Sequence, residues 1–345
     1  MRKLPLTESL RVIGRGSLNW MAERPICVSF EVTDSCTCYC KHCDHGGPKD
    51  NTRNLKPEDY DHYMKVLRPP VVQISGGEPL MRKDLLDIVK SVKRRTGMPY
   101  LILVSNWSLM TEEKYLALRE AGIHQFSVSL DFPDERHDDF RGHKGLYQKL
   151  CDIVPKLAAH GYDDIVMNTC ITSRNVAEIN RAADKAQEWG VNISFSAYSP
   201  RRVDNWDYFL TTPEQLATLD SEFAQLKKRI DDTKWILNCE TTLNETQKYF
   251  HDKGAPGCKA GLRFLVVTSD GMLQPCSMQF HRYSLEDRPR LVEEFTKNNT
   301  CDQCYVSIRS NLDKTYGQVL WENVAGFFSF KPKHGSNGQP DSSSV

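Results

Sequence analysis

The chain lacks an excess of charge of either sign. Its 345 residues include 45 lysines and arginines and 45 aspartates and glutamates, so the formal net charge at pH 7 is zero. Proteins that bind nucleic acid, or that bind membranes through basic patches, carry an excess of basic residues. The charge balance therefore argues against both functions, and we expect the partner to be a small molecule or a peptide.

The chain also lacks a long apolar run. Residues 1–25 include Arg2, Lys3, Arg11 and Arg15 and contain no stretch apolar enough for a signal peptide or a transmembrane helix. This pattern predicts a cytoplasmic protein without a transmembrane segment. Disulfides are rare in that compartment, so metal ligation is the leading explanation for those of the twelve cysteines that cluster.

Four cysteines are crowded into eight residues at Cys36, Cys38, Cys40 and Cys43. Three of them follow the spacing Cys-x3-Cys-x2-Cys, which allows three thiolates to converge on one iron–sulfur cluster and leaves its fourth iron open. Cys38 does not fit this spacing and is expected to be a bystander. A zinc knuckle and a chance cluster of cysteines are the alternatives for this stretch.

Helix-like stretches alternate with short apolar strands through the first two thirds of the chain. This alternation is typical of parallel βα units in an α/β fold. The expected strands are residues 26–33, 71–75, 100–105, 125–130, 165–171 and 192–197. Six units are fewer than the eight that close a full barrel, but active groups should still lie at the carboxyl ends of the strands.

Outside these units the sequence predicts further elements. Before the first strand we expect a helix near residues 6–21, and after Pro200 helices near 213–230, 245–250 and 307–328. Residues 262–268 and 272–275 flank a Ser-Asp-Gly turn, and they predict a β-hairpin because Asp-Gly favours the positive φ of a tight turn.

The second strand ends in the turn Ser75-Gly76-Gly77-Glu78-Pro79, whose glycines allow the backbone to approach a ligand closely. A plain βα turn is the alternative. Together with the three-cysteine loop, this turn resembles the radical S-adenosylmethionine (SAM) superfamily over residues 26–200. The resemblance implies a partial (β/α)6 TIM-like barrel, a 4Fe-4S cluster on the three spaced cysteines, and SAM on the open iron. It also implies that Gly76, Gly77 and Glu78 face the methionine amino group.

Further residues match the superfamily in the expected order. Ser129 and Arg141 are similar to residues that hold the carboxylate and ribose of SAM, although a surface salt bridge is the alternative for Arg141. His42 stands where many members have an aromatic residue that touches adenine. Asn106 and Asn168 are expected at the barrel mouth as cofactor contacts, with turn capping as the alternative.

A second cysteine set follows the barrel. Its spacing resembles the SPASM and twitch domains, which carry auxiliary 4Fe-4S clusters, and the absence of cysteines after the set favours the one-cluster twitch form. Structural zinc is the alternative. The set consists of Cys258, Cys276, Cys301 and Cys304. The expected regions are an N-terminal helical extension (1–25), the barrel (26–235), a small α+β auxiliary domain (236–330) and a disordered tail (331–345).

The resemblance implies an enzyme that reductively cleaves SAM to a 5′-deoxyadenosyl radical. This radical would abstract hydrogen from a small molecule in an oxidation, rearrangement or elimination, with electrons from a donor such as flavodoxin or ferredoxin. A maturase that modifies peptides, of the RiPP or sulfatase type, is the first alternative. A non-catalytic iron–sulfur or zinc protein is the second. Tyr198 and Asp131 are catalytic candidates by position alone.

Overall fold

The computed structural model describes residues 4–93, 98–232, 235–312, 315 and 317–318. By the packing of its Cα atoms, the chain up to residue 313 forms one compact unit. The expected boundary near residue 236 therefore stays a prediction, and the expected tail at 331–345 lies outside the described residues.

One sheet of eight strands organises the chain, in the order β6-β5-β4-β3-β2-β1-β7-β8. The six expected strands are confirmed, and they pair in parallel with their sequence neighbours. They are β1 (Cys27–Glu31), β2 (Val71–Ser75), β3 (Tyr100–Ser105), β4 (Gln125–Ser129), β5 (Ile165–Ile171) and β6 (Asn192–Ala197). The partial parallel barrel that the sequence predicts is therefore present.

The expected hairpin is confirmed, but it does not form a sheet of its own. Strand β7 (Phe264–Val267) pairs in parallel with β1, and β8 (Leu273–Gln274) pairs antiparallel with β7. Gly271 in the connecting turn has a φ of +88°, as the Asp-Gly pattern predicts. The hairpin thus extends the barrel sheet beyond β1 and places Cys258 and Cys276, which flank it, beside Cys27 of the first strand.

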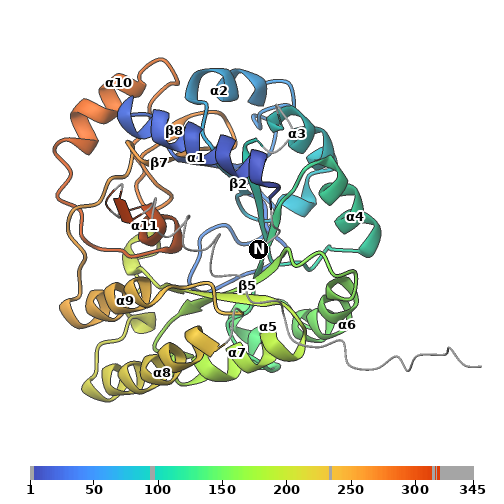
Figure 1. Cartoon of the computed structure of the whole chain (residues 1–345), viewed down its shortest axis with the longest axis vertical. Helices are drawn as coiled ribbons and strands as arrows, with labels where there is room; N and C mark the ends of the chain where they lie inside the picture. The colour runs from blue at the N-terminus through green and yellow to red at the C-terminus, as the bar shows by residue number, and fades with distance from the viewer. Residues whose placement is uncertain (1–3, 94–97, 233–234, 313–314, 316, 319–345) are drawn as a thin grey trace, which may run out of the picture. The chain divides into compact units, whose positions relative to one another are not determined.

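Helices surround the strands, and Figure 1 shows α2 to α4 and α6 to α9 around the outside of the sheet. The expected helices at 6–21 and 213–230 are confirmed, the one at 245–250 is part of the longer α9, and the one at 307–328 is described only to Leu312. The helices are α1 (Leu6–Met21), α2 (Tyr60–Leu67), α3 (Leu85–Val92), α4 (Glu112–Ala121), α5 (Arg136–Arg141), α6 (Leu146–Ala158), α7 (Ile179–Glu188), α8 (Pro213–Asp232), α9 (Glu240–Asp252), α10 (Arg288–Arg290) and α11 (Ser307–Leu312). None of the helices in the described part of the chain is long and apolar enough to cross a membrane.

The strands bury one face against the helices and turn a more polar face inward. In β2, Val72 and Ile74 are fully buried, whereas the alternate residue Ser75 is half-buried. Its hydroxyl lies 2.8 Å from the Ser29 hydroxyl of β1. The inner face of the barrel is therefore lined with groups that form hydrogen bonds.

Candidate active site

The cysteine loop follows β1 at the carboxyl end of the sheet and is held closed by backbone hydrogen bonds. The Cys36 amide donates to the Gly47 carbonyl at 2.9 Å, and the Cys43 amide donates to the Cys40 carbonyl at 3.2 Å. The four cysteines of the loop form no disulfide. Three thiols are thus presented on one short closed segment.

Cys38 is more than a bystander, because its thiol hydrogen-bonds to two of the other thiols. It is 1% exposed and lies between Cys36 and Cys40. These hydrogen bonds lower the pKa of Cys36 and, with the help of Arg141, lower the pKa of Cys40 to about 7. Two of the three spaced cysteines are therefore shifted toward the thiolate form that binds metal.

The three spaced cysteines of the loop fit the ligand set of a cubane 4Fe-4S cluster. In the described ranges, no three histidine, cysteine, aspartate or glutamate side chains gather closely enough to hold one metal ion. A cubane binds each cysteine to a different iron atom, so its ligands stand further apart than those of a single ion. Cys36, Cys40 and Cys43 offer the three thiolates that such a cluster needs while leaving one iron open.

The Gly-Gly-Glu-Pro turn is locked against the cysteine loop. The Gly77 amide donates to the Thr33 carbonyl at 2.7 Å, and the Glu78 amide donates to the Ser35 carbonyl at 2.8 Å. A Cβ atom added to Gly76 would lie 2.3 Å from the Thr33 carbonyl oxygen, and one added to Gly77 would lie 2.2 Å from the Ser35 carbonyl oxygen. Both glycines are therefore required for the turn to approach the loop, whatever else they contact.

Replacing Gly77 with alanine should destabilise the protein by about 3 kcal/mol, because the added methyl meets fixed backbone rather than a movable side chain. Gly14→Ala, which adds the same methyl in open space on α1, should be neutral or slightly stabilising. Chemical denaturation of both variants measures the difference. Equal midpoints for the two variants would contradict the close approach.

The Glu78 carboxylate is fully buried and bonded within the protein. It accepts hydrogen bonds from the Leu80 amide at 3.0 Å, the Ser105 hydroxyl at 2.7 Å and the Asn106 amide at 2.8 Å. Burial raises its pKa, and these three donors oppose the shift. The side chain thus joins the ends of β2 and β3, and its contact with the methionine amino group stays a prediction.

The two expected amide side chains differ in position. The side-chain amide of Asn106 lies 3.7 Å from the Cys36 sulfur and donates to the Thr37 hydroxyl at 3.1 Å. This side chain therefore supports the cysteine loop. Asn168 lies inside the barrel and accepts from the Ser194 hydroxyl at 2.5 Å. Ser129, at the end of β4, is half-buried and aligned with Asn168 in the sheet.

Arg141 ties the cysteine loop to the end of β4. Its Nε and Nη2 atoms each lie 2.6 Å from the Asp131 carboxylate, and its carbonyl accepts from the Cys40 thiol at 3.6 Å. The Asp131 side chain is fully buried. The surface salt bridge considered as an alternative for Arg141 is therefore wrong, since the pair is an internal one.

Neither catalytic candidate is available to a substrate in this structure. The Asp131 oxygens are occupied by Arg141 and by the Cys170 amide at 2.9 Å. Burial acts to raise the pKa of Asp131, but Arg141, His42, His137 and the Cys170 amide together outweigh it, and the net pKa is lowered. Tyr198 is 3% exposed and donates to the Asn205 carbonyl at 2.9 Å. Both assignments stay predictions, and in this structure the two side chains hold other groups of the protein.

His42 lies beside the third cysteine with its ring stacked on Phe140 at 4.7 Å between centroids. Burial lowers the pKa of His42 to about 4, with Arg141 adding to the effect, so the ring is neutral at pH 7. Its Nδ1 atom is buried and has no hydrogen-bond partner among the described residues. This nitrogen is a polar group that a bound cofactor could satisfy.

The second cysteine set is also brought together. Cys276 follows β8, and burial together with the nearby thiols of Cys304, Cys258 and Cys301 raises its pKa. Cys258 and Cys304 are 6% and 5% exposed. Thiols from three separate segments thus lie close enough to Cys276 to influence its ionisation.

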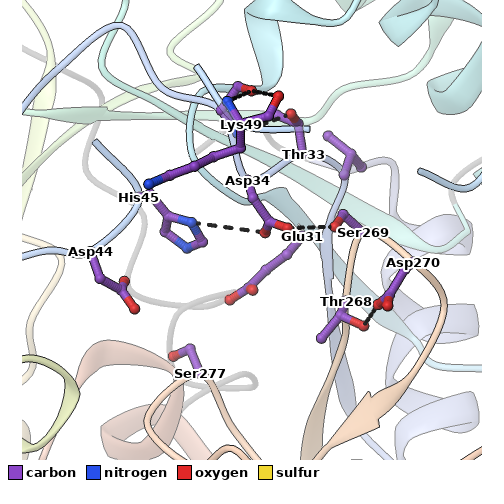
Figure 2. A network of polar contacts seen from close by, with 12 residues as sticks. Glu31, Thr33, Asp34, Asp44, His45, Lys49, Thr268, Ser269, Asp270 and Ser277 are labelled. Carbon is purple, nitrogen blue, oxygen red and sulfur yellow. Dashed lines mark hydrogen bonds and ion pairs between the residues drawn. The ribbon is translucent and has the colours of Figure 1, made fainter. Parts of the chain in front are cut away.

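Arg202, which the sequence interpretation missed, joins the two cysteine sets. Its guanidinium donates to Asp44 at 2.5 Å, to His45 Nε2 at 2.7 Å and to the Ser277 carbonyl at 3.0 Å. Asp44 directly follows Cys43, and Ser277 directly follows Cys276. Figure 2 shows Asp44, His45 and Ser277 in the same polar network. The basic pair after β6 was a usable signal, because it stands at the carboxyl end of a parallel strand.

Glu31, the last residue of β1, was also missed. It is 8% exposed, and its carboxylate lies 3.8 Å from Arg202. Burial raises its pKa to about 7, although Arg202 acts in the opposite direction. This carboxyl group can therefore be either protonated or ionised near neutral pH.

Stability should depend on Glu31 between pH 4.5 and about 7. In this range the folded protein keeps a proton that the unfolded chain, with a pKa of 4.5, releases. The free energy of unfolding contributed by this group therefore falls as pH rises, by at most about 3 kcal/mol. Glu31→Gln removes the titration, so the variant should gain stability relative to the natural protein as pH rises. Urea denaturation of both proteins at several pH values tests this, and a constant difference would contradict it.

The fold and the site together define an iron–sulfur enzyme built on a partial parallel barrel. Residues 30–186, slightly less than half of the chain, match the family model described as the Radical SAM superfamily. Together with the three spaced cysteines, this match indicates an enzyme whose cofactors are a 4Fe-4S cluster and SAM.

Several curated proteins and solved structures resemble the chain. An AdoMet-dependent heme synthase of Methanosarcina barkeri is 25% identical over 281 residues, which span 74% of this chain and 78% of that protein. A GTP 3′,8-cyclase of Aquifex aeolicus is 25% identical over 294 residues, which span 80% of this chain and 90% of that protein. The structure of anSMEcpe with bound AdoMet has a TM-score of 0.60 at 15% identity and covers 88% and 98% of the two chains. That structural similarity shows the fold alone.

Proposed function

We propose that the chain is a two-cluster radical SAM enzyme that acts on a small molecule. The first cluster would bind Cys36, Cys40 and Cys43, and an auxiliary cluster would bind the second cysteine set. The observation that carries this proposal is the Arg202 guanidinium, which bonds to the residue after Cys43 and to the residue after Cys276. An arginine in this position supports two cysteine sets that act as parts of one site.

The cluster and SAM would supply one-electron chemistry that removes a hydrogen atom from a substrate carbon. The protein's own groups would fix the cysteine loop, through the Gly77 and Asn106 contacts and through Arg141. The contacts proposed for SAM are Gly76, Gly77, Glu78, Asn106, Ser129, Arg141, Asn168 and His42. Among them, the unpartnered His42 nitrogen offers a hydrogen-bonding group for the cofactor.

A small molecule is the first choice of substrate because two relatives are named for small molecules, as a heme synthase and a GTP cyclase. A peptide is the second choice. It is supported by the mycofactocin maturase MftC of Mycolicibacterium smegmatis, which is 26% identical over 249 residues and of which the chain covers 59%. Reduced enzyme incubated with SAM and either the small-metabolite or the peptide fraction of one cell extract separates the two. Formation of 5′-deoxyadenosine should rise with the small-metabolite fraction.

The reducing electron is proposed to come from a protein such as flavodoxin or ferredoxin. The cysteine loop, which holds four thiols without a disulfide, supports a reducing compartment such as the cytoplasm.

Replacing Cys301 and Cys304 with alanine should lower the iron content from about eight to about four atoms per chain, since each cubane holds four. Protein purified without oxygen and assayed for iron and zinc measures this. Full retention of iron would contradict the auxiliary cluster, and loss of zinc instead would support the structural zinc site.

A further inference from the structure

A cavity of about 330 Å³ lies between the cysteine loop and the β7–β8 hairpin. Its walls include residues adjacent to both cysteine sets. Asp44 and His45 directly follow Cys43, and Gln274 stands two residues before Cys276. A volume of this size is typical of sites for small molecules. A ligand in this cavity would therefore lie beside both sets.

The deep end of the cavity is polar and largely buried. Glu31 and Gln274 are each 8% exposed, and Arg202 is held by its own network. The Asp34 carboxylate accepts a hydrogen bond from Ser269 at 2.8 Å. Figure 2 shows the Glu31 and Asp34 carboxyl groups gathered near the His45 ring. Such fixed groups can orient a ligand by hydrogen bonds, and the raised pKa of Glu31 allows it to donate as well as to accept.

The rim carries two exposed cations, Lys49 and Arg53, that form no ion pair with any described residue. Arg53 does act, after the hydrogen bonds from Thr52, to lower the pKa of nearby Asp50. Arg282, in contrast, is paired with Asp270 at 2.5 Å. Lys49 and Arg53 come from the same short segment, and both line the cavity.

The rim also contains one acid on that segment, Asp50, whose carboxylate accepts from the Thr52 amide at 2.9 Å. The segment 49–53 therefore has a net positive charge. Figure 2 shows the Lys49 side chain extending over the same space as His45. Two cations on one exposed segment, above a polar and buried floor, favour a ligand whose acidic end stays near that segment.

We propose that this cavity binds the substrate, and that the substrate is a small acidic molecule whose carboxylate or phosphate group is bound by Lys49 and Arg53. The identification of the ligand as the substrate rests on the proposed function, whereas the preference for an acidic ligand rests on the cavity itself. The remainder of the molecule would extend toward Glu31 and the cysteine sets.

The test uses pairs of probes that differ only in the acidic group. Ribose 5-phosphate is compared with ribose, and succinate with succinamide, by calorimetric titration of the iron-loaded enzyme. The acidic member of at least one pair should bind at least about 10-fold more tightly than its neutral partner. If only the ribose pair shows the preference, the bound group is a phosphate. If only the succinate pair shows it, the bound group is a carboxylate.

Charge variants then locate the binding. Lys49→Gln/Arg53→Gln should remove the preference for the acidic probe. Lys56→Gln/Lys144→Gln, which removes two exposed charges outside the cavity, should keep it within about 2-fold. Equal binding of acidic and neutral probes, or a preference that persists in the Lys49/Arg53 variant, would overturn the proposal. The same preparation of natural enzyme is assayed for 5′-deoxyadenosine, so a failure of the radical SAM function is recognised separately.

Discussion

Cys40→Ala should lose the first cluster and lower 5′-deoxyadenosine formation by at least about 1,000-fold, because the cofactor carries the hard chemistry. Cys40 is one of the three spaced thiols, and its pKa is lowered to about 7 by the Cys38 hydrogen bond and by Arg141. Cys38, whose thiol hydrogen-bonds to Cys40, is the thiol of the same loop that could replace it. The measurement is iron content together with product formation under reducing, oxygen-free conditions.

Cys38→Ala is the matched control, since it removes a thiol of the same loop that lacks the ligand spacing. The variant should keep its iron and retain activity, with an altered cluster reduction potential because two ligand sulfurs lose a hydrogen bond. Equal iron loss in Cys38→Ala and Cys40→Ala would instead make Cys38 a ligand. Intact activity in Cys40→Ala would contradict the three-cysteine assignment.

The barrel could be predicted from the sequence because each strand is a short apolar run between helical patterns. The six parallel strands and the hairpin turn at Gly271 follow from such local signals. The pairing of β7 with β1 could not be predicted in this way, because Phe264 and Cys27 are far apart in the sequence and nothing in either segment specifies the other. Long-range pairing depends on how the whole sheet closes.

The parts of the site that depend on a local sequence motif could be predicted. The parts that depend on contacts between distant segments could not. The spacing of the cysteines and the Gly-Gly-Glu-Pro turn are local patterns, and the structure brings them together. The burial of Asp131 and its pairing with Arg141 could not be predicted, because they depend on a neighbouring helix. Arg202 was missed for the same reason, since its partners lie about 160 residues before it and 75 after it.

Arg202→Ala should lower the free energy of unfolding by about 3 kcal/mol, because it removes one partner of a largely buried ion-pair network. The Arg202 side chain is 14% exposed and the facing Glu31 side chain 9% exposed, so water can replace little of the lost interaction. The pKa of Glu31 should rise further once this cation is gone, since Arg202 now acts to lower it. Urea denaturation across pH 5 to 9, a range set by the Glu31 pKa of about 7, measures both effects.

Arg201→Ala is the control for the loss of a neighbouring arginine. Arg201 is exposed and bonds to the uncharged side chains of Gln303 and Gln279, so its loss should cost less than about 1 kcal/mol. Arg202→Lys keeps the charge but lacks the fork of donors that reaches Asp44 and Ser277 together, and should lie between the two. If Arg202→Lys were as stable as the natural protein, a positive charge at position 202 would be enough to stabilise the network without the guanidinium fork. If Arg201→Ala were as damaging as Arg202→Ala, the bridge between the cysteine sets would depend on the whole segment after β6 rather than on one guanidinium.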